Sequence, residues 1–225
     1  MNSMYQQLMQ LPLFQGVSTE RITALVEKLP FHFLKFRNGE HVFDVGDPCT
    51  HIKFIVSGKV RLETPFPNLR VTMHQTVSNP HVLAAEYLFG RETVYPYTAI
   101  SEGPCGILQL RKSDYIKIIS TDKIFLFNIL NYLSSGSQRT VQLPLAVNDG
   151  SVAERLAMLV DALSISGATD IGLHFKQKDL CTLLGTQRTT LVSTLDKLSD
   201  QGILDYNSNE LSILDLRALF NVSSN

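Results

Sequence analysis

KQKDLCTLLGTQRTTLVSTLDKL, residues 176–198, decides the fold of the second half of this 225-residue chain. Its leucines recur every three or four residues on both sides of Gly185, which predicts two short helices separated by a glycine turn. These leucines are Leu180, Leu183, Leu184, Leu191, Leu195 and Leu198. The spacing is typical of a helix-turn-helix, although an ordinary helical hairpin inside a core would show it too.

The residues that follow favour the helix-turn-helix. Gly202 ends the second helix, residues 203–206 and 211–214 read as strands, and residues 207–209 read as the turn between them. Two helices followed by a small hairpin predict a winged helix-turn-helix. We expect the outward face of the second helix to meet base edges in DNA; it carries Gln187, Arg188, Thr189, Ser193 and Asp196. The expected phosphate contacts are Lys176, Lys178 and Thr186.

Charge argues against this interpretation. The net charge is −1, and the sequence from residue 151 onward contains six lysines and arginines but nine aspartates and glutamates. Binding to phosphates favours the opposite sign, although a total does not say where the charges lie. We therefore expect modest and strongly salt-dependent affinity. The alternative is a ligand-sensing or protein-interaction module that has lost DNA binding.

Composition and motifs exclude several other classes. The longest apolar run, residues 124–133, is too short and too polar to span a bilayer, and residues 1–14 do not resemble a signal peptide, so a cytoplasmic protein is expected. Cys49, Cys105 and Cys181 are far apart, which argues against a disulfide framework or a zinc knuckle and favours buried thiols. No metal ligands are predicted. Common nucleotide-binding, metalloprotease and hydrolase motifs are absent, so we do not expect an enzyme.

The first half of the chain is rich in short β-like runs. A helix is predicted at residues 18–28, beginning with a serine cap. Ser57 and Gly58 read as a hairpin turn, and residues 103–106 as another turn. The pattern predicts a compact antiparallel barrel or roll. The predicted strands are residues 31–36, 41–43, 52–56, 59–62, 70–77, 97–100 and 107–111.

Residues 121–146 predict a long helix between the two halves. Its apolar stripe can pack on its own roll or on a twin helix, and we favour a dimer; the stripe contains Leu126, Ile129, Leu130 and Leu133. Pro144 should kink or end the helix, and Ser151 with Glu154 form a capping box that starts the next one. The predicted domain boundary is residues 147–150. The expected domains are residues 1–120, 121–147 and 148–225.

The sequence therefore predicts an α+β fold: an N-terminal antiparallel β-roll, a long helix and a C-terminal winged helix-turn-helix. This order resembles the CRP/FNR family of bacterial transcription regulators over nearly the whole chain. Residues 43–62, FDVGDPCTHIKFIVSGKVRL, place Gly46 and Gly58 where that family turns between strands. Residues 183–204 resemble its recognition helix and the start of its wing. The resemblance implies a homodimer that binds double-stranded DNA, contacts RNA polymerase and re-aims its recognition helices when the roll binds a small-molecule effector.

The resemblance also marks where this chain departs from the family. Cyclic AMP-binding members carry Gly-Glu, a short helix and Arg-Ser-Ala or Arg-Thr-Ala; the matching residues of the expected effector pocket are Ala85, Glu86, Tyr97 and Thr98. Tyr97 replaces the arginine that neutralises the phosphate, so cyclic AMP is not the expected effector, although Arg91 lies between these segments. The effector and any cofactor stay unidentified: three cysteines are too few for an FNR-like cluster, and no histidine stands out as a haem ligand.

The predicted recognition helix departs as well. The cyclic AMP receptor reads DNA with Arg, Glu and Arg, and the equivalent positions here are Arg188, Thr189 and Ser193. Arg188 alone keeps its charge and could bind guanine through two hydrogen bonds. The operator should therefore differ from that of the receptor.

Overall fold

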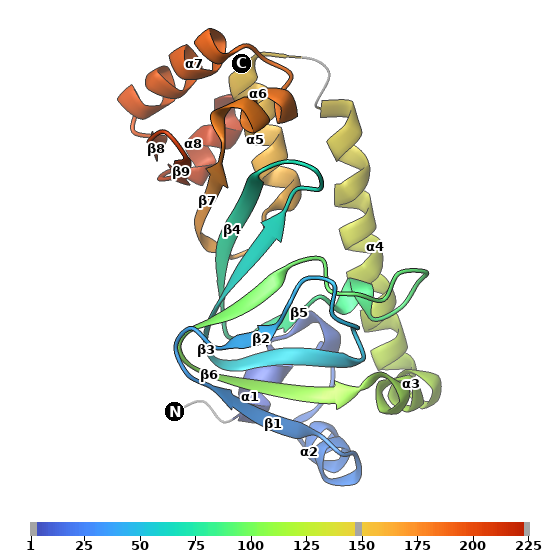
Figure 1. Ribbon diagram of the computed structural model, residues 1–225. Coiled ribbons are helices and arrows are strands. Elements are labelled where there is room, and N and C mark those ends of the chain that lie inside the picture. Colours follow the sequence, from blue (N-terminus) through green and yellow to red (C-terminus); the bar gives the residue numbers. More distant parts are fainter. Residues whose placement is uncertain (1–3, 147–149, 223–225) are drawn as a thin grey trace. The chain divides into compact units, whose positions relative to one another are not determined.

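The computed structural model describes residues 4–146 and 150–222 (Figure 1). The chain forms two compact units: Met1–Leu62 with Val77–Ser137, and Glu63–Thr76 with Gln138–Asn225. Residues 63–76, which include the turn between β3 (His51–Pro65) and β4 (Val71–Ser78), therefore belong to the C-terminal unit, which the sequence did not predict. The predicted domain limits stay a prediction, and residues 147–149 of the predicted boundary lie outside the described residues.

The N-terminal unit begins with short helices and continues as an antiparallel roll. Ser18 caps α2 by accepting a hydrogen bond from the Arg21 backbone, as predicted. Strands β1 and β2 both pair with β6, and β5 pairs with β3. The elements are α1 (Met4–Met9), η1 (Pro12–Phe14), α2 (Thr19–Lys28), β1 (His32–Phe36), β2 (His41–Phe43), β3 (His51–Pro65), β5 (His81–Leu83), η2 (Ala85–Tyr87) and β6 (Thr98–Arg111).

Two predicted turns of the roll are wrong, because each lies inside a continuous strand. Gly58 lies within β3 at φ +86°, and a Cβ there would come within 2.4 Å of the Pro104 carbonyl oxygen. The glycine thus allows β3 to approach residues 104 and 105 closely. Residues 103–106 lie within β6, where Cys105 pairs with Phe36 of β1.

Two helices follow β6: α3 (Lys112–Thr121), which was not predicted, and α4 (Lys123–Ala146). Helix α4 ends at Ala146, two residues after Pro144, so it ends near this proline as predicted. No helix of the described ranges is long and apolar enough to cross a membrane. Cys49 and Cys105 are buried free thiols as predicted, whereas Cys181 is half-buried.

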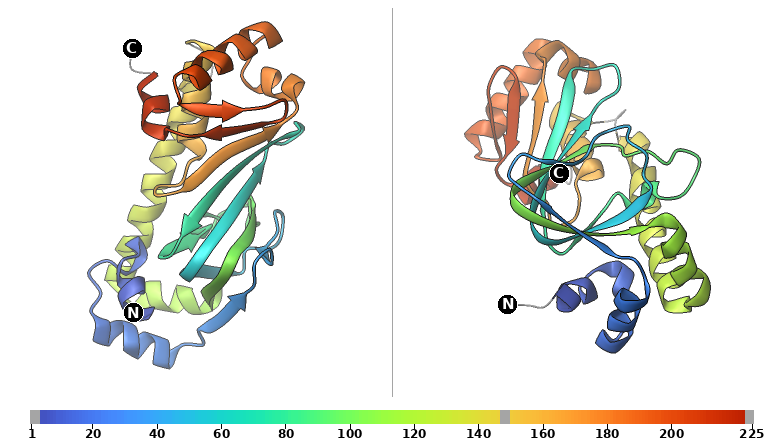
Figure 2. Two further views of the ribbon diagram at one scale, coloured as in Figure 1. Left: turned by 90° about the vertical axis from the view of Figure 1, so that its left-hand side faces the viewer. Right: turned by 60° about the horizontal axis from the view of Figure 1, so that its bottom comes forward.

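The described residues of the C-terminal unit combine an antiparallel sheet with helices α5 to α8 and the end of α4. Ser151 and Glu154 form the predicted capping box at the start of α5. The strands of the sheet follow the order β4, β7, β9, β8, and Figure 2 shows them side by side. The elements are β4 (Val71–Ser78), α5 (Val152–Leu163), β7 (Thr169–Phe175), α6 (Gln177–Leu183), α7 (Arg188–Asp200), β8 (Leu204–Tyr206), β9 (Glu210–Ile213) and α8 (Leu216–Asn221).

Candidate nucleic-acid interface and effector pocket

Helices α6 and α7 form the predicted helix-turn-helix. Gly185 takes φ +56°, a left-handed conformation that suits glycine, and the Thr186 amide donates to the Cys181 carbonyl at 2.9 Å. From α5, the Arg155 guanidinium donates to the Gly185 carbonyl at 3.1 Å. Sequence reasoning missed Arg155, because its contact lies 30 residues away along the chain.

The leucine seam of the two helices is buried as expected. Leu180 and Leu191 are fully buried, and Leu184, Leu195 and Leu198 are at most 3% exposed. Leu183 is only half-buried. The seam joins the hydrophobic core of the C-terminal unit, which also includes Leu156 of α5 and Leu211 of β9. Because the seam faces this core, the orientation of α7 is determined by packing.

The opposite face of α7 is exposed, and it carries the residues predicted to read bases. These exposed residues are Gln187, Arg188, Thr189, Ser193 and Asp196. Gln187 is the N-cap residue and Arg188 begins the helix. Their side chains are therefore accessible at the end of α7 where unpaired backbone amides give a partial positive charge.

A shallow surface groove lies beside this face. None of the seven residues that line it is acidic: Lys178, Cys181, Thr182, Gly185, Thr186, Gln187 and Thr190. Lys176 and Lys178 are exposed, while Thr186 is half-buried. The groove thus brings Lys178 and Thr186, two of the predicted phosphate contacts, next to Gln187 of the predicted reading face.

Two acids of the helix-turn-helix have partners. Asp179 of α6 accepts hydrogen bonds from the backbone and the guanidinium of Arg70, with the Nε distance at 3.0 Å. These hydrogen bonds with Arg70 lower the pKa of Asp179, so its charge is paired with a cation. On α7, Asp196 accepts a hydrogen bond from the Tyr206 hydroxyl of the wing. The Arg70 contact spans 109 residues, and no sequence signal indicates it.

Two further acids of the C-terminal unit cap helices. The Glu154 carboxylate accepts a hydrogen bond from the Ser151 backbone amide, and the Asp215 carboxylate accepts one from the Ala218 amide at the start of α8. At least four of the nine acids found after residue 150 therefore have specific hydrogen-bond partners. The acidic total consequently says little about the charge of the groove.

Aromatic side chains pack together among the residues of the predicted effector pocket. Tyr97 is 9% exposed, and its ring lies 5.7 Å from that of Phe43, which stacks on Tyr95 at 3.6 Å. Burial, with the nearby Glu86 carboxylate, raises the pKa of Tyr97, so its phenol stays neutral. Thr98 accepts a hydrogen bond from the Val45 amide at 3.2 Å.

Glu86, whose carboxylate lies near Tyr97, also lies close to α4. Burial and the nearby Glu86 carboxylate raise the pKa of Tyr132 of α4, and the Cγ of Glu86 would lie 3.9 Å from a Cβ placed at Gly136. Ala85 is buried in η2, Glu86 is exposed, and Arg91 is also exposed. The structure therefore connects the predicted cassette to α4 through Glu86.

The predicted stripe of α4 is divided between two environments. Ile129 is 2% exposed, so it belongs to the core of its own unit, and Leu133 is half-buried. Leu126 and Leu130 are 37% and 48% exposed. Phe127, which the sequence analysis did not single out, is 61% exposed and adds to this apolar surface.

Comparisons with known proteins match both units. The cyclic nucleotide-binding domain model matches residues 33–122, and the Crp-like helix-turn-helix domain model matches residues 151–222. No curated protein sequence matches the chain.

Solved structures agree on the fold. The catabolite activator protein of Thermus thermophilus is 20% identical, with a TM-score of 0.50 over 95% of this chain and 98% of that one. A CooA mutant from Carboxydothermus hydrogenoformans is 18% identical, with a TM-score of 0.50 over 89% and 90%. At these identities the likeness shows the fold alone. The two domain models, which together match residues 33–122 and 151–222, show that the chain belongs to the CRP/FNR family of transcription regulators, with an effector-binding domain followed by a Crp-like helix-turn-helix domain.

Proposed function

We propose that this protein is a homodimeric, sequence-specific DNA-binding regulator whose α7 enters the major groove. The observation that carries the proposal is the division of α7 into a buried leucine seam and an exposed polar face that includes Arg188. The packing of the seam presents a guanidinium, an amide and hydroxyl groups outward, which are the groups that read base edges. Lys176, Lys178 and Thr186 contact phosphates and set the register on the duplex.

The dimer brings two recognition helices together. Leu126, Phe127 and Leu130 on α4 form an exposed apolar surface that a second copy would bury. A two-fold dimer presents its reading helices about 34–36 Å apart, which matches successive major grooves on one face of DNA. The operator is then two inverted half-sites. RNA polymerase, which the family membership implies as a partner, would be contacted from such a site.

DNA binding is tested by selection of bound fragments from random duplexes, followed by an electrophoretic shift with the full chain. We expect two chains per selected duplex. Lys178→Ala should weaken binding to all sequences alike, because a phosphate contact carries no base information. The slope of log affinity against log salt should fall by about one per lost contact, hence by about two in a dimer.

Lys28→Ala, which removes an exposed lysine at the end of α2, is the matched control and should leave that slope unchanged. Absence of any shift at low salt would contradict the proposal. It would favour instead the interaction module that has lost DNA binding.

We also propose that the effector acts through Glu86 and α4. The contacts of Glu86 with Tyr132 and beside Gly136 offer a route by which an occupied pocket changes the packing of that helix and re-aims the DNA-binding domain. The effector itself is a small molecule other than cyclic AMP. Tyr97 supports this exclusion, because a buried neutral phenol supplies no charge to a cyclic phosphate.

Titration calorimetry of the full chain with cyclic AMP should therefore show no saturable binding up to about 1 mM, a binding free energy weaker than about −4 kcal/mol. Linear AMP, which carries the same base and a phosphate, is the comparison ligand and should likewise show no saturable binding. Saturable heat at micromolar cyclic AMP would contradict the assignment.

A further inference from the structure

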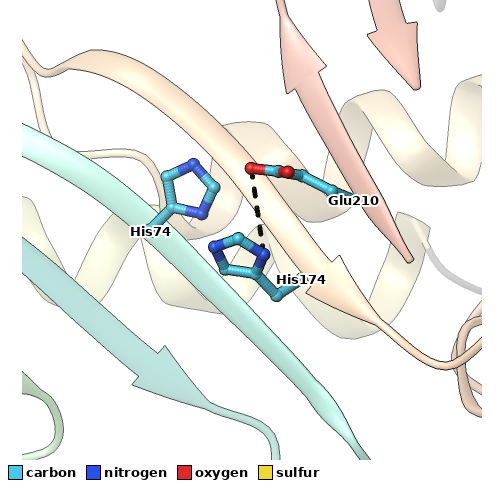
Figure 3. Close-up of side chains that lie close together, drawn as sticks. All are labelled: His74, His174 and Glu210. Atoms are coloured by element: carbon cyan, nitrogen blue, oxygen red, sulfur yellow. Dashed lines mark ion pairs between the residues drawn. The ribbon is translucent and has the colours of Figure 1, made fainter. Parts of the chain in front are cut away.

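Three side chains from three neighbouring strands meet on one face of the C-terminal sheet: His74 of β4, His174 of β7 and Glu210 of β9 (Figure 3). The strand register explains the meeting. His74 lies opposite Gly172, and His174 lies opposite Glu210 across the next ladder. All three residues belong to the same compact unit.

The alternation of side chains along each strand places this group on the outer face of the sheet. Met73, Leu173 and Leu211, the immediate neighbours of the three residues, are at most 1% exposed and form part of the core. His174 and Glu210 keep 51% and 42% of their side-chain surface exposed. An ion in solution can therefore reach the group without opening the core.

The distances suit a shared ion. The potential ligand atoms of the three residues all lie within 4.8 Å of one another, and the Nδ1 of His174 lies 3.8 Å from Oε1 of Glu210. The two imidazole centroids are 4.7 Å apart. Bonds of about 2.0–2.1 Å in a tetrahedral site hold ligand atoms roughly 3.3–3.5 Å apart, so small side-chain rotations would complete the site.

Gly172 makes room for this arrangement. A Cβ at this position would lie 2.7 Å from both Cε1 and Nε2 of His74, and 2.5 Å from the Leu211 carbonyl oxygen. With glycine here, the His74 ring lies over the backbone of β7, on the same side as His174 and Glu210. A larger residue would displace the imidazole from the group.

We propose that His74, His174 and Glu210 bind a divalent transition-metal ion of the zinc class. Two imidazole nitrogens and one carboxylate oxygen suit Zn²⁺ and its neighbours, whereas Mg²⁺ and Ca²⁺ prefer oxygen ligands alone. One tetrahedral position stays open to water. Because each ligand comes from a different strand, the ion joins β4 to β7, which precedes the helix-turn-helix, and to β9, the second strand of the wing. The three residues are 100 and 36 positions apart in the sequence, which explains why no sequence motif indicates the site.

The test uses the full, tag-free chain after chelation of metals. Zn²⁺ titration should show one site per chain, and Co²⁺ should produce the intense visible bands of a tetrahedral complex. His74→Ala, His174→Ala and Glu210→Gln should each weaken binding at least tenfold, since even loss of an outer hydrogen-bond partner of a metal ligand costs about 10–100-fold. Zn²⁺ at 100 times its dissociation constant should raise the Tm by about 5–11 °C.

Two variants serve as controls. Ser212→Ala changes the same face of the sheet without removing a proposed ligand, and His32→Ala removes an exposed histidine of the other unit; both should bind Zn²⁺ like the wild type. A simple ion pair of His174 and Glu210 predicts no tetrahedral Co²⁺ spectrum. That result, or equal Zn²⁺ affinity in the three ligand variants, would overturn the proposal. DNA binding is measured separately, so failure of the metal site leaves the proposed function untouched.

Discussion

Replacing Leu191 by alanine should lower the free energy of unfolding of the C-terminal unit by about 2–5 kcal/mol, the usual cost of removing a fully buried leucine side chain. Leu191 is 0% exposed and is part of the cluster that joins α7 to the rest of the unit. The loss combines less burial of apolar surface with a cavity that the neighbours fill only in part. Urea unfolding followed by circular dichroism measures it as a lower midpoint with an unchanged slope.

Leu214→Ala is the matched control, because it makes the same chemical change at a side chain that is 63% exposed. It should change the free energy of unfolding by no more than about 0.5 kcal/mol. Equal losses in the two variants would show that the seam does not hold α7. DNA affinity of Leu191→Ala should fall with stability, since an unfolded α7 presents no reading face.

Arg188→Ala should produce the second large effect. If Arg188 binds guanine through two hydrogen bonds, its loss removes about 1–3 kcal/mol of discrimination, equivalent to roughly 5–150-fold at one base pair of each half-site. Competition between the selected operator and single-base variants measures this directly. Preference should relax at that base pair alone. Unchanged specificity would refute the role of Arg188.

Two further variants separate base reading from simple charge. Arg188→Lys keeps the charge but cannot form the planar pair of hydrogen bonds, so non-specific affinity should persist while discrimination falls. Lys197→Ala removes an exposed cation from the last turn of the same helix. It should alter affinity for all sequences alike, or not at all. Loss of specificity in Lys197→Ala would mean that charge on α7, and not the contact of Arg188, determines base preference.

The local elements of the DNA-binding domain were predictable because their signals lie close together in sequence. The leucine period, Gly185 and the Ser151–Glu154 capping box depend on neighbours three or four residues away, and the structure confirms them. Strand β7 was missed although residues 169–175 contain alternating apolar residues. Its partner β4 lies about 100 residues earlier, and the alternation alone did not reveal that pairing.

The errors in the roll have a common origin. Gly58 and Gly103 suggested turns in the sequence, because glycine is common where a turn needs a positive φ. Both residues do have positive φ, but each lies inside a strand. In β3, however, glycine also lets the backbone pass close to Pro104 and Cys105, and that approach is invisible in a linear sequence. The predicted stripe of α4 was likewise uniform in sequence, although burial separates Ile129 from Leu126 and Leu130.

By itself, the sequence determined the helix-turn-helix, its wing and the order of roll, long helix and DNA-binding domain, because periodicity and capping act over a few residues. Only the tertiary structure decided how the acids are engaged, as Arg70 with Asp179 shows, and which side chains form the group of His74, His174 and Glu210. These contacts join strands and loops that are far apart in the chain. Their energies depend on distance in space, which the register of β4, β7 and β9 determines.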